Sequence, residues 1–405
     1  MDRRAFGVAV LLSVTSPAAW AADAELATLP IRGSVSAEPL PIGGLQVEPT
    51  RYVRTCALYG NRYMNIDGGD TCIRIGGYVR ADYLVAEPDL RGSQYNFQSR
   101  AVMSYDARTA TELGTLQTYA AVRIDTSTLR GTDTGGPDSQ TRLDRAFISY
   151  AGWTFGLTKS LFDLDVNWNF FGSRAADRNT LLMTYTYFLP DGFFIAGSLE
   201  DGTARRGDIQ GRRRTHAYGG SRIPDIVAAV GQSGEGYYAK LAGAFREVRP
   251  RNPNKFDTEY GCAARASVVA ELPSGGGRDR LGVAAVVGSG AASYIGFDDD
   301  IDGFAAVNRF DGSTGYSGIV SLQHWWDETW WSAATLAAGQ LNRSNRSGQG
   351  DRTYVETAAN LVRQPYDGFY IGAEGKYVWD RNGPPGRADF GDEGWSGLLR
   401  AYRSF

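Results

Sequence analysis

Hydrophobic and polar residues alternate along a stretch near the start of the chain, Thr71 to Val85. Successive side chains of a β-strand point to opposite faces, so this alternation predicts a strand with two different faces. One face carries Ile73, Ile75, Val79, Ala81, Tyr83 and Val85, and the other carries Arg74, Gly76, Arg80 and Asp82. The polar face holds fixed charges rather than the Ser and Thr of a solvated edge, which raises the question of what surrounds each face.

Segments with the same alternation recur to the end of the sequence, each about ten residues long. We interpret them as sixteen strands. Their predicted ranges are 73–85, 96–110, 115–125, 141–150, 153–157, 181–189, 193–200, 225–230, 236–247, 261–271, 281–290, 316–326, 330–340, 353–363, 369–379 and 394–405.

The links between these segments alternate in length. Short links rich in Gly, Asp and Pro, which are typical of tight hairpin turns, follow the even-numbered segments, and longer links follow the odd-numbered ones. This parity predicts an all-β fold, a 16-stranded antiparallel transmembrane β-barrel with short periplasmic turns and long extracellular loops. A barrel of this size leaves an aqueous channel. The alternative, a soluble two-layer β-sandwich, gives no reason to sort loop lengths in this way.

The barrel hypothesis assigns a solvent to each face. The apolar side chains would face lipid, and aromatic residues gather near strand ends, as at Trp325, Trp326, Trp330 and Trp331. The charged side chains would line water, because burying so many charges in a dry core costs several kcal/mol for each unpaired one. The predicted pore-wall residues are Arg74, Arg80, Arg100, Arg108, Arg123 and Arg142.

Composition and processing signals place this barrel outside the cytoplasm. The chain has 51 Gly, 22 Tyr, 18 Phe and 9 Trp among 405 residues, and its mature part has no apolar run long enough for a membrane helix. Residues 1–21 resemble a secretory signal peptide, with a partial twin-arginine match at Arg3 and Arg4. Residues 22–50 are predicted to be a flexible lead-in, and residues 51–405 the barrel domain.

Three cysteines and a small net charge limit the chemistry. In an oxidising compartment Cys56 and Cys72 are expected to form a disulfide and to leave Cys262 unpaired; a metal site is the weaker alternative, because no CxxC occurs. A formal net charge of −3 does not indicate a nucleic-acid partner. Two histidines and the absence of GxSxG, HExxH and phosphate-loop motifs argue against an enzyme, and no cofactor is expected.

The third long link, residues 158–180, is rich in aromatic residues and carries both charge signs. A loop with so many apolar side chains is expected to pack against something rather than extend into water. Folded into the lumen, it would form the constriction, with Asp163, Asp165, Arg174 and Asp177 as its charged residues. Charged groups at a narrow point select ions. The alternative is an outer cap or a subunit contact.

Several runs resemble the alphaproteobacterial porins, among them YVRTCALYG, GGDTCIRIGGYVRADYLV, SRAVMSYDARTATELGTLQTYAAVRID, RLDRAFISYAGWTFGLTKSLFDLD and PDIVAAV. The resemblance covers residues 52–405. It implies trimeric sixteen-stranded outer-membrane barrels, passive diffusion of small hydrophilic solutes, and an inward-folded third loop. It also matches Cys56 and Cys72 to the paired cysteines of the family, Phe162, Asp163 and Asp165 to its third-loop motif, and Phe405 to its terminal aromatic residue.

The sequence departs from that family in two places. Arg403 occupies an outward position two residues before the end, where such proteins usually carry an apolar or aromatic residue. Residues 201–224 are unusually basic, with charges that would attract anions or lipopolysaccharide. These charges are Arg205, Arg206, Arg212, Arg213 and Arg214. The run FDDDIDGF also begins like a calcium loop, with Asp298, Asp300 and Asp302, but Arg309 stands where the bidentate Glu belongs.

Three functions follow from this reading. The leading one is an outer-membrane homotrimeric porin, embedded in lipid and lipopolysaccharide, that passes small hydrophilic solutes and ions. A substrate-selective channel of the same fold, for instance for sugars, would use aromatic residues at the constriction such as Trp168, Phe170 and Phe171. A plugged structural or adhesive barrel is the third alternative.

Overall fold

The structure, a computed structural model, describes most of the chain beyond residue 52. The described ranges are 53–60, 62–66, 69–90, 93–128, 138–174, 177–211, 218–250, 258–274, 278–298, 300–306, 309–344, 347–383 and 393–405. The predicted signal peptide and lead-in, residues 1–50, lie outside these ranges, as do Arg212, Arg213 and Arg214. No helix in the described ranges is long and apolar enough to cross a membrane.

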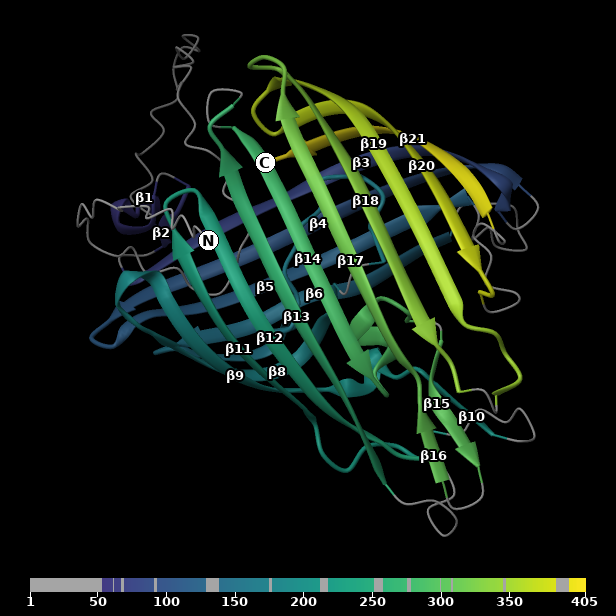
Figure 1. The fold of residues 1–405 in the computed structure, drawn as a ribbon. Coiled ribbons are helices and arrows are strands. Elements are labelled where there is room, and N and C mark those ends of the chain that lie inside the picture. The colour runs from purple at the N-terminus through teal and green to yellow at the C-terminus, as the bar shows by residue number, and fades with distance from the viewer. Residues whose placement is uncertain are drawn as a thin grey trace, which may run out of the picture. The chain divides into compact units, whose positions relative to one another are not determined.

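Sixteen antiparallel strands form a closed barrel, which confirms the predicted fold class (Figure 1). Each strand pairs with the next along the chain, and the last, β21, pairs with the first, β3, to close the sheet. The strands are β3 (Thr71–Leu90), β4 (Ser93–Thr111), β5 (Gly114–Ser127), β6 (Asp138–Tyr150), β7 (Trp153–Lys159), β8 (Asn179–Phe188), β9 (Phe193–Glu200), β11 (Asp225–Gly234), β12 (Tyr237–Val248), β13 (Glu259–Leu272), β14 (Asp279–Ser289), β17 (Thr314–Trp325), β18 (Trp330–Asn342), β19 (Arg352–Tyr366), β20 (Phe369–Arg381) and β21 (Glu393–Ser404).

Tight turns join the strands at one rim. The link between β6 and β7 has only two residues, Ala151 and Gly152, with φ of 49° and 85°. Two positive φ values characterise the type I′ turn, whose twist matches that of a two-stranded hairpin. The 3₁₀ turn η3 (Pro190–Gly192) joins β8 to β9 at the same rim. The longer connections lie at the other rim, as the sequence predicts.

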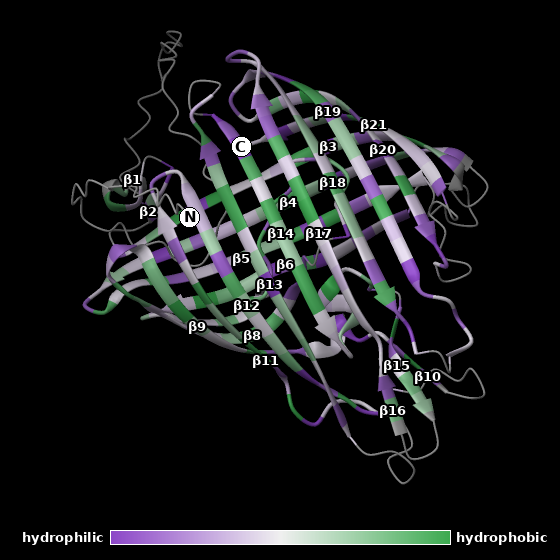
Figure 2. Cartoon of the chain, in the orientation of Figure 1, coloured by the Kyte–Doolittle hydropathy of each residue, from purple (hydrophilic) through white to green (hydrophobic). Residues whose placement is uncertain are grey.

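The two faces of the strands are as different as the alternation indicates, and the hydropathy colouring changes along the strands accordingly (Figure 2). On β9 exposed and buried residues alternate strictly, with Ile195 and Leu199 pointing outward and Phe194 and Ala196 inward. The outward side chains are largely apolar, as expected for a surface in contact with lipid, with charged exceptions such as Arg363 and Arg403. The inward side chains differ from one part of the barrel to another.

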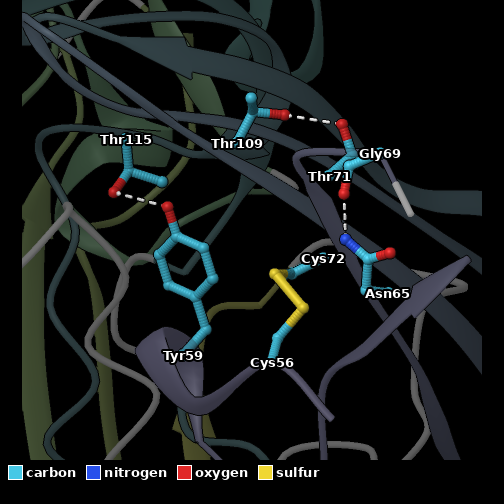
Figure 3. The surroundings of a disulfide bond; sticks show 8 residues. All are labelled: Cys56, Tyr59, Asn65, Gly69, Thr71, Cys72, Thr109 and Thr115. Atoms are coloured by element: carbon cyan, nitrogen blue, oxygen red, sulfur yellow. Dashed lines mark hydrogen bonds between the residues drawn. A yellow bond between two sulfur atoms is a disulfide. The ribbon is translucent and has the colours of Figure 1, made fainter. Parts of the chain in front are cut away.

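A small N-terminal unit attaches to the rim with the short turns. Strands β1 (Val53–Thr55) and β2 (Met64–Ile66) enclose the 3₁₀ turn η1 (Ala57–Tyr59), and β2 pairs with the part of β3 that extends beyond the end of β21. Cys56 and Cys72 form the predicted disulfide, with Cα atoms 5.9 Å apart (Figure 3). Beside it, the hydroxyls of Thr71 and Thr109 are 2.8 Å apart.

A three-stranded sheet, which the sequence analysis did not predict, lies among the long connections (Figure 1). The long connections are numbered in chain order, so that the third joins β7 to β8. Strand β10 (Asp208–Gly211) belongs to the fourth, between β9 and β11, and β15 (Ile301–Ala306) and β16 (Arg309–Gly312) belong to the sixth, between β14 and β17. Strands β10 and β15 pair in parallel. The fourth connection also contains the 3₁₀ turn η4 (Gly202–Arg205), and the sixth contains η6 (Ala292–Ile295).

The apolar core lies inside the barrel along β9, β11–β14 and β17–β19. The inward side chains of these strands are mostly small, such as Ala229, Ala242 and Ala284. They leave room for two segments that fold inward: Phe162 of the third connection and Tyr294 of the sixth meet edge to face, with ring centroids 4.9 Å apart. This half of the barrel therefore has a second layer of chain against its inner wall.

Candidate functional site

The third connection, residues 160–178 and called the third loop below, folds into the lumen as predicted. It first follows the inner wall across β9, β12 and β13. Glu200 accepts hydrogen bonds from the Ser160 hydroxyl, at 2.6 Å, and from the Leu161 backbone, at 2.8 Å. Lys240 donates to the Leu161 carbonyl at 3.0 Å, and Arg265 donates to the Leu164 carbonyl at 2.7 Å. Charged wall residues thus hold the loop through its backbone.

The tip of the third loop is fixed to β20. The Glu374 carboxylate accepts hydrogen bonds from the backbone N–H groups of Phe170 and Phe171. The Phe170 ring stacks on Tyr370, with centroids 5.7 Å apart, and the Arg400 guanidinium lies 4.7 Å from the Phe170 centroid. A charged acceptor for two backbone donors and an aromatic stack together define one position for the tip.

Arg174 and Asp163 anchor the third loop rather than project from it. Arg174 donates to Asp380 at 2.6 Å, and its backbone N–H donates to Glu356 at 2.7 Å. The Asp163 carboxylate is completely buried, paired with Arg205 of η4. Burial lowers the pKa of the Arg205 guanidinium and Asp163 raises it, with an upward net shift. Of the four residues predicted at the constriction, these two hold the loop in place.

The other two, Asp165 and Asp177, have side chains that are 43% and 58% exposed. Lys159, at the end of β7, forms ion pairs with both, at 3.1 Å to Asp177. These three side chains form the exposed charged group of the third loop. Lys159 was not among the predicted site residues, because it sits where strand alternation ends and the loop begins.

The wall formed by β3–β6 and β21 carries the predicted pore-wall arginines, and we call it the arginine face. Near the rim with the short turns, Asp106 pairs with Arg74 at 3.6 Å and with Arg108 at 3.0 Å. Farther from that rim, Asp82 pairs with Arg80 at 3.3 Å and with Arg400 at 2.6 Å. Each aspartate is therefore shared by two guanidinium groups.

A third aspartate of the arginine face, Asp125, is shared by three guanidinium groups. Its carboxylate lies 2.6 Å from Arg100, 2.6 Å from Arg123 and 2.7 Å from Arg142. Arg123 also reaches Asp144 at 3.9 Å. All six predicted wall arginines thus lie on one side of the lumen, and the wall holds them through a smaller number of carboxylates.

Two inward arginines of this face, Arg145 and Arg400, were not among the predicted pore-wall residues. The alternation of β21 points Arg400 inward with Leu398, so its parity was a usable signal. Arg145 pairs with inward Ala121 only because the register of β5 and β6 shifts next to it. Such a β-bulge inserts one extra residue and reverses the face of all that follow, and the sequence contains no clear mark of it.

The acidic run 298–302 is used in internal contacts. Asp300 pairs with Arg343 at 2.5 Å and with Arg352 at 3.1 Å. Asp302 accepts hydrogen bonds from the backbone of Ala292 at 2.8 Å and of Gly207 at 3.0 Å. The described residues contain no group of three or more acidic, His or Cys side chains placed to bind a metal ion. Asp302 therefore joins the fourth and sixth connections, and Asp300 joins the sixth connection to Arg343 and Arg352.

The outward Arg403 is also accommodated. Its side chain is exposed, and its guanidinium donates to the carbonyl of Asp367 at 2.9 Å, in the turn between β19 and β20. It therefore lies at the rim with the short turns, where the long arginine side chain can reach the polar interface.

Comparison with known proteins agrees with this architecture. Porin Omp2b of Brucella neotomae is 24% identical over 372 residues, covering 88% of this chain and 91% of that protein. Porin Omp2a of Brucella suis biovar 1 is 23% identical over 386 residues, covering 88% and 92%. Among solved structures, the outer membrane channel DcaP of Acinetobacter baumannii has a TM-score of 0.66 at 14% identity, covering 84% of this chain and 99% of that one. Salmonella typhi OmpF has a TM-score of 0.56 at 11% identity, covering 83% and 98%.

The sequence profile of the Porin subfamily matches residues 44–382, which is most of the chain and includes every barrel strand except the last, β21. The closed sixteen-stranded barrel agrees in overall fold with the outer membrane channel DcaP. The chain therefore belongs to the Porin subfamily and is an outer-membrane channel for passive diffusion.

Proposed function

We propose that solutes cross this barrel between the exposed charged group of the third loop (Lys159, Asp165 and Asp177) and the arginine face. The observation that carries the proposal is the unequal lining of the lumen. Along β9, β11–β14 and β17–β19 the inner wall is covered by the third loop and the sixth connection. Along β3–β6 no part of the chain that the structure describes covers the inward charges in this way, and Arg142 is 52% exposed.

The chemistry of this passage favours small hydrophilic solutes. Both sides present charged groups, which keep the passage hydrated, so a polar solute can exchange its water for contacts with the wall. An apolar solute gains nothing from such a wall. The carboxylates of Asp165 and Asp177 on one side and the guanidinium groups on the other also produce an electric field across the passage.

The assembly in the membrane forms part of the proposal. We propose a homotrimer embedded in outer-membrane lipid and lipopolysaccharide, without a catalytic role. The resemblance to alphaproteobacterial porins supports the trimer. The apolar outward side chains, such as Ile195, Leu241 and Leu336, support the contact with lipid and with neighbouring copies.

Single-channel recording from refolded protein in a planar lipid bilayer tests this function. Open-channel current in steps that close in groups of three is the expected result. Folded protein, verified by its resistance to SDS at room temperature, that carries no current would overturn the diffusion function and leave a plugged barrel. Current in single steps would retain the channel and overturn the trimer.

A further inference from the structure

We infer that the arginine face is an anion-binding track, which makes the channel prefer small solutes that carry two or more carboxylate or phosphate groups. This inference rests on the proposed function, since it names the solute class of the same passage. It follows from three features of the arginine face: the ratio of its charges, their exposure and their spacing along the wall.

The ratio of charges favours anions. At the middle of the wall, Arg80 and Arg100 face each other in the register of β3 and β4, and Arg100 faces Asp125 in that of β4 and β5. Five arginines and three aspartates form this upper group. They are Arg80, Arg100, Arg123, Arg142, Arg400, Asp82, Asp125 and Asp144. Two positive charges therefore stay unbalanced within the group, and five N–H donors on each guanidinium exceed what three carboxylates can accept.

The difference in exposure between arginines and aspartates adds to the excess of positive charge that a solute meets. The side chains of Asp82 and Asp106 are 1% and 2% exposed, whereas Arg74, Arg108 and Arg142 are 34%, 32% and 52% exposed. These two carboxylates thus lie beneath the arginines that they position, whereas Asp125 and Asp144, at 17% and 28%, are about as exposed as Arg100 and Arg123, both at 19%. A solute in the lumen meets guanidinium groups, whose planar forks match the two oxygens of a carboxylate or phosphate.

A second group of arginines lies farther along the same wall. Arg74 and Arg108 share Asp106 in a lower group nearer the rim with the short turns. Arg74 precedes Arg80 by six residues on β3, which corresponds to about 20 Å along a strand. An anion that leaves the upper group would therefore find a further pair of guanidinium groups on the same wall, and weak binding at successive sites is what conduction requires.

The opposite side does not cancel this preference. Its exposed charged group has two carboxylates, Asp165 and Asp177, which share the ammonium of Lys159. It therefore has an excess of one negative charge against an excess of two positive charges in the upper group. A solute with charges at two points gains more from the arginine face than it loses near the third loop.

The test measures reversal potential under a KCl gradient and the block of chloride current by added succinate or inorganic phosphate. The unmodified channel is expected to prefer chloride, and millimolar succinate or phosphate is expected to reduce its current, whereas uncharged glycerol at the same concentration is not. Block by both anions supports recognition of oxyanions in general, and block by succinate alone supports recognition of paired carboxylates.

Two variants locate the effect. Arg142→Gln, and the double variant Arg100→Gln with Arg142→Gln, are expected to shift the reversal potential toward cation preference and to weaken succinate block about tenfold. The matched control is Arg363→Gln, which removes the same charge from an exposed side chain stacked on Trp330, 5.8 Å from its ring centroid. It is expected to change neither measurement.

Cation preference in the unmodified channel, or equal behaviour of Arg142→Gln and Arg363→Gln, would overturn the anion track while leaving the diffusion channel in place. Folded protein without current would overturn both. Because conductance and selectivity come from the same recording, the failure of one proposal can be told from the failure of the other.

Discussion

Asp163 of the third loop and Arg205 of η4 form an ion pair in which both side chains are buried, with exposures of 0% and 1%. The Arg205 guanidinium also lies over the Tyr294 ring of η6, 4.5 Å from its centroid. Burial and the carboxylate of Asp225 raise the pKa of the Tyr294 phenol, so it stays protonated and donates to Asp225. The position of the third loop therefore depends on residues of the fourth and sixth connections.

Replacing Asp163 by Ala is expected to destabilise the folded barrel by roughly 3–5 kcal/mol, because it leaves the buried Arg205 charge without its partner. Denaturant unfolding followed by tryptophan fluorescence measures the loss. The control is Asp165→Ala on the same loop, whose carboxylate is 43% exposed and which should cost about 1 kcal/mol or less. Equal costs for the two variants would contradict the buried pair.

Glu374 is expected to control the mobility of the tip of the third loop. Glu374→Ala removes the acceptor for the Phe170 and Phe171 backbone groups, and we expect frequent short transitions between conductance levels in single-channel records. Glu271→Ala is the control, since this carboxylate is 49% exposed and holds no part of the loop that the structure describes. A quiet Glu374→Ala channel would show that the aromatic stack alone fixes the tip.

Loss of the disulfide should affect the N-terminal unit and leave conduction intact. Cys56 and Cys72 are 16 residues apart, and closing a loop of this size contributes about 3 kcal/mol in the chain-entropy description. The double variant Cys56→Ser with Cys72→Ser is expected to be cut faster by trypsin before β3, with unchanged single-channel conductance. Cys262→Ser, at an exposed position of β13, should match the unmodified protein. A changed conductance in the double variant would place the N-terminal unit in the solute path.

Calcium is expected to leave thermal stability unchanged. The carboxylates of Asp300 and Asp302 are already engaged by Arg343, Arg352 and the backbone, so a cation would have to displace these partners. Melting in detergent should occur at the same temperature with calcium chloride and with EDTA, and sodium chloride of equal ionic strength serves as the control. A rise of several degrees in calcium alone would contradict this reading.

The strands could be predicted from the sequence because lipid on one side and water on the other impose a strict alternation, which survives in segments such as 193–200. The arginine face followed from the same rule. The roles of the third-loop residues could not be predicted in this way. Asp163 and Asp165 stand two positions apart, but only Asp163 is buried, against Arg205 and Arg265 from distant parts of the chain. Strands β10 and β15 were not predicted either, because they are short and pair across connections far apart in the chain.

One signal for the inner layer was present in the sequence. Segments such as DIVAAV, LAGAF and GVAAVV are apolar on both faces, although only one face of a water-filled barrel should be. Small residues on the second face, such as Ala229 and Ala242, indicate that another part of the chain packs there. The sixth connection and the third loop pack against the inner face of these strands, which explains why both faces are apolar.

The second layer of chain covers only part of the inner wall, so the barrel has two mechanically different halves. Along β9, β11–β14 and β17–β19, two close-packed layers resist bending, since dense interiors have low compressibility. Along β3–β6 the residues that the structure describes form a single sheet, which must take up most thermal deformation. The compliant half is also the one that carries the arginines, so each outward excursion of the wall widens the passage and moves its positive charges away from the third loop. The width of the passage and the electric field across it then change together. We therefore expect current noise and ion preference to change together as the temperature is raised.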